Sequence, residues 1–276
     1  MKNLEAYKMD GLGNDFIIFD KRKKSFSLSK DQIIKISDRN NIGCDQVIFI
    51  DEDKNSKTVF LEFYNSDGGE IAACGNGSRC VAYLLMKESK SKKISLTTKA
   101  GTLHAELNDE NLVSINMGKP NFEWEKIPLL KKMDYKNLKI KIKSNEGTDV
   151  IGGFSLSIGN PHVIFFVDDL NKFDLKKIGP EIENHNYFPD KCNVTLAAIK
   201  NKKHVAVKVW ERGAGLTKAC GTAACATAVS GAILKLSERS VNIEFSEGLI
   251  NIDWNINNNI YMKGKVSEIK KIIVNI

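Results

Sequence analysis

The sequence predicts an α+β fold of two pseudo-symmetric domains, each a curled, mostly antiparallel sheet or barrel around a central helix. At 276 residues the chain is longer than most single domains, which cluster at roughly 100 to 150 residues, so two domains of similar size are expected. The sequence also repeats itself at a fixed offset. Short β-branched and aromatic runs dominate both halves, and each half has one strong helical segment.

The internal repeat is carried by three matches at an offset of 146 residues, as in 159 minus 13 for the first. They are Gly13-Asn14 with Gly159-Asn160, residues 59–64 with 205–210, and Ala73-Cys74-Gly75 with Ala219-Cys220-Gly221. After one inserted residue, Gln46 aligns with Asn193 and Gly101 with Gly248. Because separate matches at one offset rarely arise by chance, the two halves are expected to share a fold.

Strands are predicted wherever β-branched and aromatic runs are bounded by Gly, Asn or Asp. They cover 16–19, 47–50, 59–64, 94–98 and 103–107 in the first half, and 155–158, 163–167, 205–210, 241–245 and 249–254 in the second. Helices are predicted over 76–87 and 222–236, and the second is apolar on nearly every face, so it should be buried. Residues 119–147, with prolines and a lysine run, are interpreted as the transition between the halves.

Composition argues against a disordered, collagen-like or disulfide-stapled chain. With 42% hydrophobic residues, 27% charged residues and 5 prolines, the chain is expected to be globular. No apolar run approaches the roughly 20 residues of a membrane helix, and the first residues lack a signal peptide, so we expect a cytoplasmic protein without membrane contact. The net charge of +7 comes from dispersed lysine clusters without interleaved aromatics, which argues against nucleic acid as a partner.

Two of the six cysteines occupy a position that favours reactivity. Cys74 and Cys220 each follow a strand and a glycine-rich loop and precede a helix, where free backbone N–H groups and the helix dipole favour a thiolate. A single cysteine there is commonly only packed, but two in equivalent positions of a repeat favour a function. Packing is preferred for Cys44, Cys80, Cys192 and Cys225, and the spacings of Cys74 with Cys80 and of Cys220 with Cys225 do not predict a zinc site.

The segments that flank these cysteines closely resemble the diaminopimelate epimerases, a family of cofactor-independent amino-acid racemases and epimerases. The resemblance covers essentially the whole chain. It rests on residues 8–16 (KMDGLGNDF), 43–46 (GCDQ), 65–77 (NSDGGEIAACGNG), 159–162 (GNPH), 193–194 (NV), 211–215 (ERGAG) and 219–222 (ACGT). Several of these motifs are distinctive alone, and in this order they are highly specific.

The resemblance implies an enzyme that interconverts LL- and meso-2,6-diaminopimelate in lysine biosynthesis, without pyridoxal phosphate, metal or other cofactor. Inverting an α-carbon requires removing its proton on one face and delivering another on the opposite face, so two thiols can serve as base and acid. The family's active site lies in a cleft between two domains, here expected as 1–118 plus 263–276 and as 119–262. The family also implies a homodimer.

The residues implied by the family's pattern fall into three groups. Cys74 and Cys220 match the catalytic pair, and His162 and Glu211 match positions that tune the pKa values of the cysteines. The substrate-binding positions are Asn14, Gln46, Asn65, Gly75, Asn76, Asn160, Asn193, Glu211, Arg212, Gly221 and Thr222.

Two alternatives remain open on the sequence. A proline or hydroxyproline racemase uses the same two-cysteine chemistry, but diaminopimelate has a second amino-acid centre that needs a distal site, and Asn65, Asn160, Asn193 and Arg212 supply suitable groups. A thiol redox sensor would instead join Cys74 and Cys220 in a regulatory disulfide.

Overall fold

The chain divides into two units, which are described separately. The computed structural model describes residues 3–52 and 58–276. The first unit comprises Met1–Asn116 together with Lys263–Ile276, and the second comprises Met117–Met262. Strand β18 (Ile260–Lys265) begins in the second unit and ends in the first.

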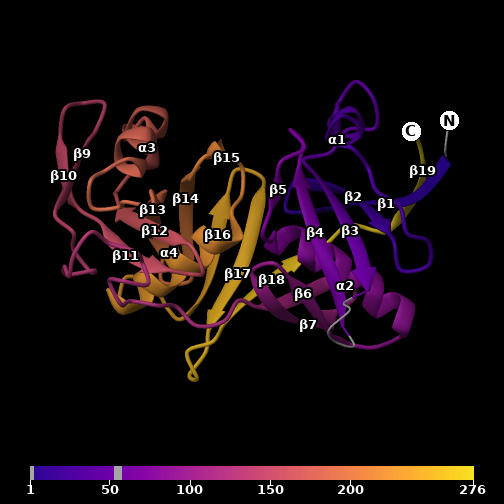
Figure 1. Cartoon of the computed structure of the whole chain (residues 1–276). Coiled ribbons are helices and arrows are strands. Elements are labelled where there is room, and N and C mark those ends of the chain that lie inside the picture. The colour runs from indigo at the N-terminus through magenta and orange to yellow at the C-terminus, as the bar shows by residue number, and fades with distance from the viewer. Residues whose placement is uncertain (1–2, 53–57) are drawn as a thin grey trace. The chain divides into compact units, whose positions relative to one another are not determined.

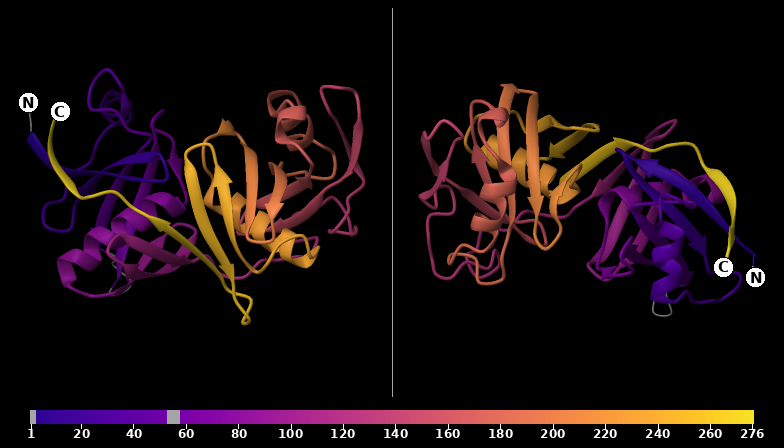
Figure 2. Two further views of the ribbon diagram at one scale, coloured as in Figure 1. Left: turned by 180° about the vertical axis from the view of Figure 1, so that it is seen from behind. Right: turned by 90° about the horizontal axis from the view of Figure 1, so that it is seen from above.

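The first unit surrounds helix α2 with strands (Figure 1). Its elements are β1 (Asn3–Gly11), β2 (Asn14–Asp20), α1 (Lys30–Ser37), β3 (Gln46–Glu52), β4 (Val59–Asn65), β5 (Glu70–Ile71), α2 (Gly75–Ser89), β6 (Lys93–Thr98), β7 (Gly101–Asp109), β8 (Leu112–Asn116) and β19 (Lys270–Asn275). Helix α2 contacts β1, β2, β6, β7 and β8. The C-terminal strand β19 pairs antiparallel with β1, so these two strands from opposite ends of the sequence lie side by side (Figure 2).

The second unit surrounds helix α4 in the same way. Its elements are β9 (Ile140–Lys143), β10 (Asp149–Gly152), β11 (Phe154–Ser157), β12 (Pro161–Phe166), the 3-10 helix η1 (Leu170–Lys172), α3 (Leu175–Glu183), β13 (Asn193–Asn201), β14 (His204–Glu211), β15 (Gly215–Thr217), α4 (Gly221–Ile233), β16 (Ser240–Phe245) and β17 (Gly248–Trp254). Helix α4 contacts β11, β12, β13, β16 and β17.

The sequence repeat is also a repeat of strand pairing. Strands β2 and β3 pair in parallel with Phe16 opposite Gln46, and β12 and β13 pair in parallel with His162 opposite Asn193. The pairs β3–β4, β4–β5 and β6–β7 are antiparallel, as are β13–β14, β14–β15 and β16–β17. The predicted α+β class, with mostly antiparallel sheets around two central helices, is therefore confirmed.

The central helices are buried because almost all of their surface faces strands. Every residue from Ala223 to Gly231 in α4 is buried, which confirms the prediction made from its apolar composition. Helix α4 ends earlier than the predicted Leu236, because Lys235 adopts a left-handed backbone conformation with φ of 59°. Helix α2 is also buried along most of its length and includes the fully buried Arg79.

Several elements differ from the sequence prediction, which did not include strands β1, β9, β10 and β13. Helices α1 and α3 were not predicted. The interpretation of residues 119–147 as a transition between halves is wrong, because the division falls at Asn116 and Met117. Apolar side chains of this segment, among them Ile127, Leu138 and Ile140, are buried in the core of the second unit. Burying these apolar side chains away from water stabilises the fold, so the segment packs as part of the second unit.

The position of α2 depends on close packing against a glycine of β18. A Cβ atom at Gly264 would lie 2.9 Å from Cζ of Arg79, whose side chain is fully buried. We expect Gly264→Ala to lower the free energy of unfolding by about 1–3 kcal/mol, measured by urea denaturation. Gly152→Ala is the control, because no heavy atom lies within 4 Å of its added Cβ. Equal stability of the two variants would contradict this packing argument.

Within the described ranges, 3–52 and 58–276, no helix combines the length and apolar character needed to span a membrane.

Candidate active site

Cys74 and Cys220 occupy equivalent positions at the N-termini of the two central helices. Cys74 is the N-cap of α2 with φ −138° and ψ 117°, and Cys220 is the N-cap of α4 with φ −141° and ψ 114°. Each thiol therefore lies beside backbone N–H groups that have no partner within the helix. The Sγ atom of Cys74 accepts a hydrogen bond from the N–H of Gly77 at 3.4 Å.

The two thiols differ in their surroundings. Cys74 is half-buried, whereas Cys220 is buried. Burial raises the pKa of Cys220 well above its usual range, and the negative charge of Glu211 raises it further. At Cys220, desolvation of the charged form therefore outweighs the helix dipole, which alone would favour a thiolate. The structure favours a protonated thiol at this position.

Each cysteine is followed two residues later by a side chain that pairs with an asparagine. In the first unit Nδ2 of Asn76 donates to Oδ1 of Asn14 at 2.8 Å. In the second unit Nδ2 of Asn160 donates to Oγ1 of Thr222 at 3.4 Å, and this hydroxyl lies 3.5 Å from Sγ of Cys220. The same pair of repeat positions is thus in contact in both units.

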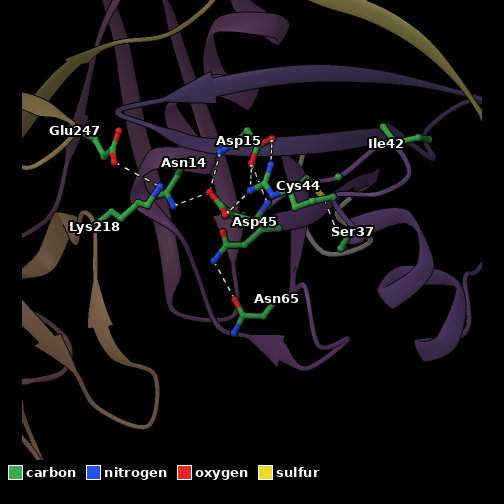
Figure 3. Close-up of polar contacts among 12 residues, drawn as sticks. Asn14, Asp15, Ser37, Ile42, Cys44, Asp45, Asn65, Lys218 and Glu247 are labelled. Carbon is green, nitrogen blue, oxygen red and sulfur yellow. Dashed lines mark hydrogen bonds and ion pairs between the residues drawn. The ribbon is translucent and has the colours of Figure 1, made fainter. Parts of the chain in front are cut away.

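The ends of the central strands bring further predicted residues together. In the first unit Nε2 of Gln46 donates to Oδ1 of Asn65 at 3.0 Å (Figure 3). In the second unit Oδ1 of the buried Asn193 accepts from the backbone N–H of Arg212 at 3.0 Å. The guanidinium of Arg212 is exposed, and its Nη1 donates to the carbonyl of Asp190 at 2.9 Å.

His162 is a neutral member of the second unit's network. It is fully buried, and this burial, together with the positive charge of Arg212, lowers its pKa to about 3. Its Nε2 atom lies 2.9 Å from Oδ1 of Asn160. Since an amide oxygen only accepts, Nε2 must carry the proton, and His162 therefore orients the Asn160 amide toward Thr222.

The buried His162 makes stability depend on pH. A histidine whose pKa falls from its usual 6.5 to about 3 on folding contributes stability that is complete above pH 6.5 and is lost as the pH falls toward 3. We expect this residue to account for a loss of about 1 kcal/mol between pH 7 and pH 5.5. His162→Gln, which retains an N–H donor, should remove that part of the loss. Urea denaturation of both proteins at the two pH values checks this, and equal losses would contradict it.

An ion cluster in the first unit was missed by the sequence analysis. The side chains of Asn14, Asp15 and Asp45 point toward one another (Figure 3), and Arg39 bonds to both carboxylates. Asp15 and Asp45 lie within the motifs 8–16 and 43–46, but nothing in either motif indicates that they meet. Arg39 lies just after α1, which the sequence analysis did not predict. The capping box formed by Ser29 and Gln32 was the sequence signal that could have indicated this helix.

No grouping of three or more His, Cys, Asp and Glu side chains suited to a metal ion occurs within the part of the chain that the structure describes. The N-termini of α2 and α4 can bind an anion, because unpaired backbone N–H groups and the positive end of the helix dipole attract a carboxylate. Each unit therefore combines an ionisable thiol with donors for a carboxylate.

The sequence is similar along most of its length to known diaminopimelate epimerases. The family model described as diaminopimelate epimerase matches residues 6–123 and 154–269. A diaminopimelate epimerase of Pelagibacter ubique (strain HTCC1062) is 55% identical over 270 residues, covering 98% of this chain and 98% of that protein. One of Caulobacter sp. (strain K31) is 38% identical over 270 residues, covering 94% of this chain and 93% of that protein.

Solved structures with low sequence identity share the fold. A Bacillus anthracis phenazine biosynthesis protein of the PhzF family has a TM-score of 0.68 at 16% identity, with both chains fully covered. A probable proline racemase of Agrobacterium radiobacter has a TM-score of 0.67 at 11% identity, covering 99% of this chain and 93% of that one. Given the family match over both repeats and the identity to its members along nearly the whole sequence, the chain belongs to the diaminopimelate epimerase family.

Proposed function

We propose that the chain is a diaminopimelate epimerase that interconverts LL- and meso-2,6-diaminopimelate in lysine biosynthesis by two-base proton transfer. The observation that carries the proposal is the pair of N-cap cysteines, which have the same backbone conformation in matching positions of the repeat. Relatives that match nearly the whole chain are described as diaminopimelate epimerases, which supports the substrate.

The reaction requires one thiolate and one thiol at a time. We propose that Cys220 is the resting thiol, because burial and Glu211 hold its proton. Cys74, at the less buried N-cap, then removes the α-proton as the thiolate, and Cys220 donates its proton to the opposite face of the α-carbon. In the reverse direction the roles exchange, so each thiol serves as base and as acid.

The carbanion formed in this reaction needs stabilisation from groups already in place. Removing the α-proton moves negative charge onto the α-carboxylate, which then accepts stronger hydrogen bonds. We propose that backbone N–H groups at Gly75-Asn76 and Gly221-Thr222 donate them, since these residues open the helices that the cysteines cap. The proposal needs no cofactor, because the donors stabilise the charge that a cofactor would otherwise delocalise.

The remaining assignments follow from the family's pattern. We propose that the epimerase domains are 1–118 plus 263–276, with Cys74, and 119–262, with Cys220. The substrate would also contact Asn14, Gln46, Asn65, Asn160, Asn193, Glu211 and Arg212, with His162 and Glu211 tuning the cysteines. A cytoplasmic homodimer is part of the same proposal, to be checked by light scattering of the purified protein and by cell fractionation.

The test is α-proton exchange by purified, reduced protein in deuterated water, followed by NMR. We expect rapid exchange with LL- and meso-diaminopimelate and none with proline or trans-4-hydroxyproline. Exchange restricted to the cyclic amino acids would instead support a racemase of that class. Thiol titration with and without reductant tests the redox-sensor alternative. A redox sensor would show reversible oxidation of Cys74 and Cys220 and no exchange of substrate α-protons.

A further inference from the structure

An ion cluster beside β2 fixes the side chain of Asn14 in one orientation. Arg39 donates to both oxygens of Asp15, from Nη1 at 2.7 Å and from Nη2 at 2.8 Å, and Nη2 also donates to Oδ1 of Asp45 at 2.7 Å. The other oxygen of Asp45, Oδ2, accepts from Nδ2 of Asn14 at 3.2 Å and from the backbone N–H of Asp15 at 3.1 Å. Both oxygens of the Asp45 carboxylate are thus engaged.

This arrangement determines how the next side chain is held. An ionised carboxylate only accepts hydrogen bonds, so Asn14 must turn its NH₂ group toward Asp45 and its oxygen away. That oxygen, Oδ1, accepts from Nδ2 of Asn76 at 2.8 Å. Asn76 is buried in the first turn of α2, two residues after Cys74. A continuous relay therefore runs from Arg39 through Asp45 and Asn14 to the start of the helix that Cys74 caps.

The loop that supplies Arg39 and Asp45 is itself closely fitted. A Cβ atom at Gly43 would lie 3.0 Å from both Cα and Cδ of Arg39, and Gly43 has a left-handed backbone with φ of 73°. The Nζ atom of Lys8 donates to the carbonyls of Ile42 and Gly43 at 3.0 and 2.9 Å. Although the side chain of Arg39 is 58% exposed, its position is fixed by this loop.

The second unit holds its equivalent asparagine by a different device. Asn160 is oriented by the neutral His162, and its NH₂ group faces Thr222 at the start of α4. The NH₂ group of Asn14, by contrast, faces Asp45 and not the start of α2. The residue aligned with Asp45 after the one-residue insertion is Cys192, which is buried and has no carboxylate. The charged relay is therefore a property of the first unit, the one that carries Cys74.

We propose that Asp45 is a positioning residue for proton transfer at Cys74, held in place by Arg39 and Asp15. This role rests on the proposed function. The carboxylate of Asp45 orients Asn14, Asn14 orients Asn76, and Asn76 aligns the first turn of α2 with the reacting α-carbon. Asp45 itself contacts no reacting atom in this scheme. Its replacement should therefore slow the chemical step more than it weakens substrate binding.

The first arm of the test is kinetic. Asp45→Asn replaces one of two accepting oxygens with an NH₂ group, so either Asn14 or Arg39 loses its acceptor. We therefore expect kcat for diaminopimelate to fall about 10- to 100-fold with KM within about threefold of wild type. Arg39→Gln, which leaves the carboxylate but removes its support, should lower kcat less. Arg39→Gln also carries the test if Asp45→Asn fails to fold.

The matched control is Arg22→Gln in the same unit. Arg22 bonds Asp20 through Nε at 2.9 Å and Nη2 at 2.7 Å, and Glu88 through Nη2 at 2.6 Å, so it is also an arginine between two carboxylates. We expect it to keep wild-type kinetics. Wild-type kcat in Asp45→Asn, or an equal fall in Arg22→Gln and Arg39→Gln, would overturn the proposal.

The second arm does not depend on activity. In ¹⁵N-labelled protein, Asp45→Asn should shift the side-chain NH₂ resonances of both Asn14 and Asn76, whereas Arg22→Gln should shift neither. Unchanged Asn76 resonances in Asp45→Asn would overturn the relay. If wild-type protein exchanges no α-proton of diaminopimelate, the proposed function fails while this arm still decides whether the relay exists.

Discussion

Cys220→Ala is expected to abolish epimerisation of diaminopimelate while leaving the fold intact. In the proposed mechanism this thiol supplies the proton on one face of the α-carbon, and general acid–base groups of this kind contribute about 10²- to 10⁴-fold. The fold should persist because the change removes a single buried heavy atom and leaves an apolar side chain at the start of α4. Steady-state kinetics from both diaminopimelate isomers, with circular dichroism of the variant, check this. Cys74→Ala should be equally inactive but slightly less stable, because its Sγ accepts from Gly77.

Cys225→Ala is the matched control for this experiment. Cys225 lies in the same helix and is fully buried, but it follows the first turn that Cys220 caps. We expect wild-type kinetics and a loss of stability of about 1 kcal/mol from the cavity. Normal turnover by Cys220→Ala, or a comparable loss of activity in Cys225→Ala, would exclude the two-thiol mechanism.

The sequence predicted those parts of the fold that local pattern determines. The repeat placed several paired strands and both N-cap cysteines, because hydrophobic runs and the Ala-Cys-Gly segments occur in both halves, but strand β13 was not predicted. It did not predict α3, although Leu175, Ile178 and Ile182 are buried at helical spacing, because Gly179 and Pro180 interrupt the pattern. Gly179 is needed there, since a Cβ atom would clash with the Trp210 ring.

The chemistry of the candidate site was only partly predictable. Residue type and repeat position, which are local properties of the sequence, indicated the two cysteines, and the family resemblance supplied the asparagines. The raised pKa of Cys220 was not predictable, because burial depends on tertiary packing around α4. The cluster of Asp15, Arg39 and Asp45 was missed for a related reason, since the parallel pairing of β2 with β3 brings together residues 30 positions apart.

Arg212→Lys is expected to lower kcat/KM for diaminopimelate about 10- to 100-fold, because one hydrogen bond between charged groups contributes about 1.5–3 kcal/mol. We propose that Arg212 holds the distal carboxylate of the substrate. Its backbone is fixed by Asn193 and its Nη1 by the carbonyl of Asp190, so the planar guanidinium presents its other N–H groups in a set direction. Lysine retains the charge that lowers the pKa of His162 but lacks this fork.

The substrate itself provides the sharpest control for Arg212. L-Lysine is diaminopimelate without the distal carboxylate, so slow α-proton exchange of L-lysine should be the same in wild type and in Arg212→Lys. Arg239→Lys, which changes another arginine of the second unit that donates to backbone carbonyls of Trp254 and Asn255, should leave diaminopimelate kinetics unchanged. If Arg212→Lys slowed both substrates equally, the guanidinium would act on the reacting end of the substrate or on the fold, and its assignment to the distal carboxylate would be wrong.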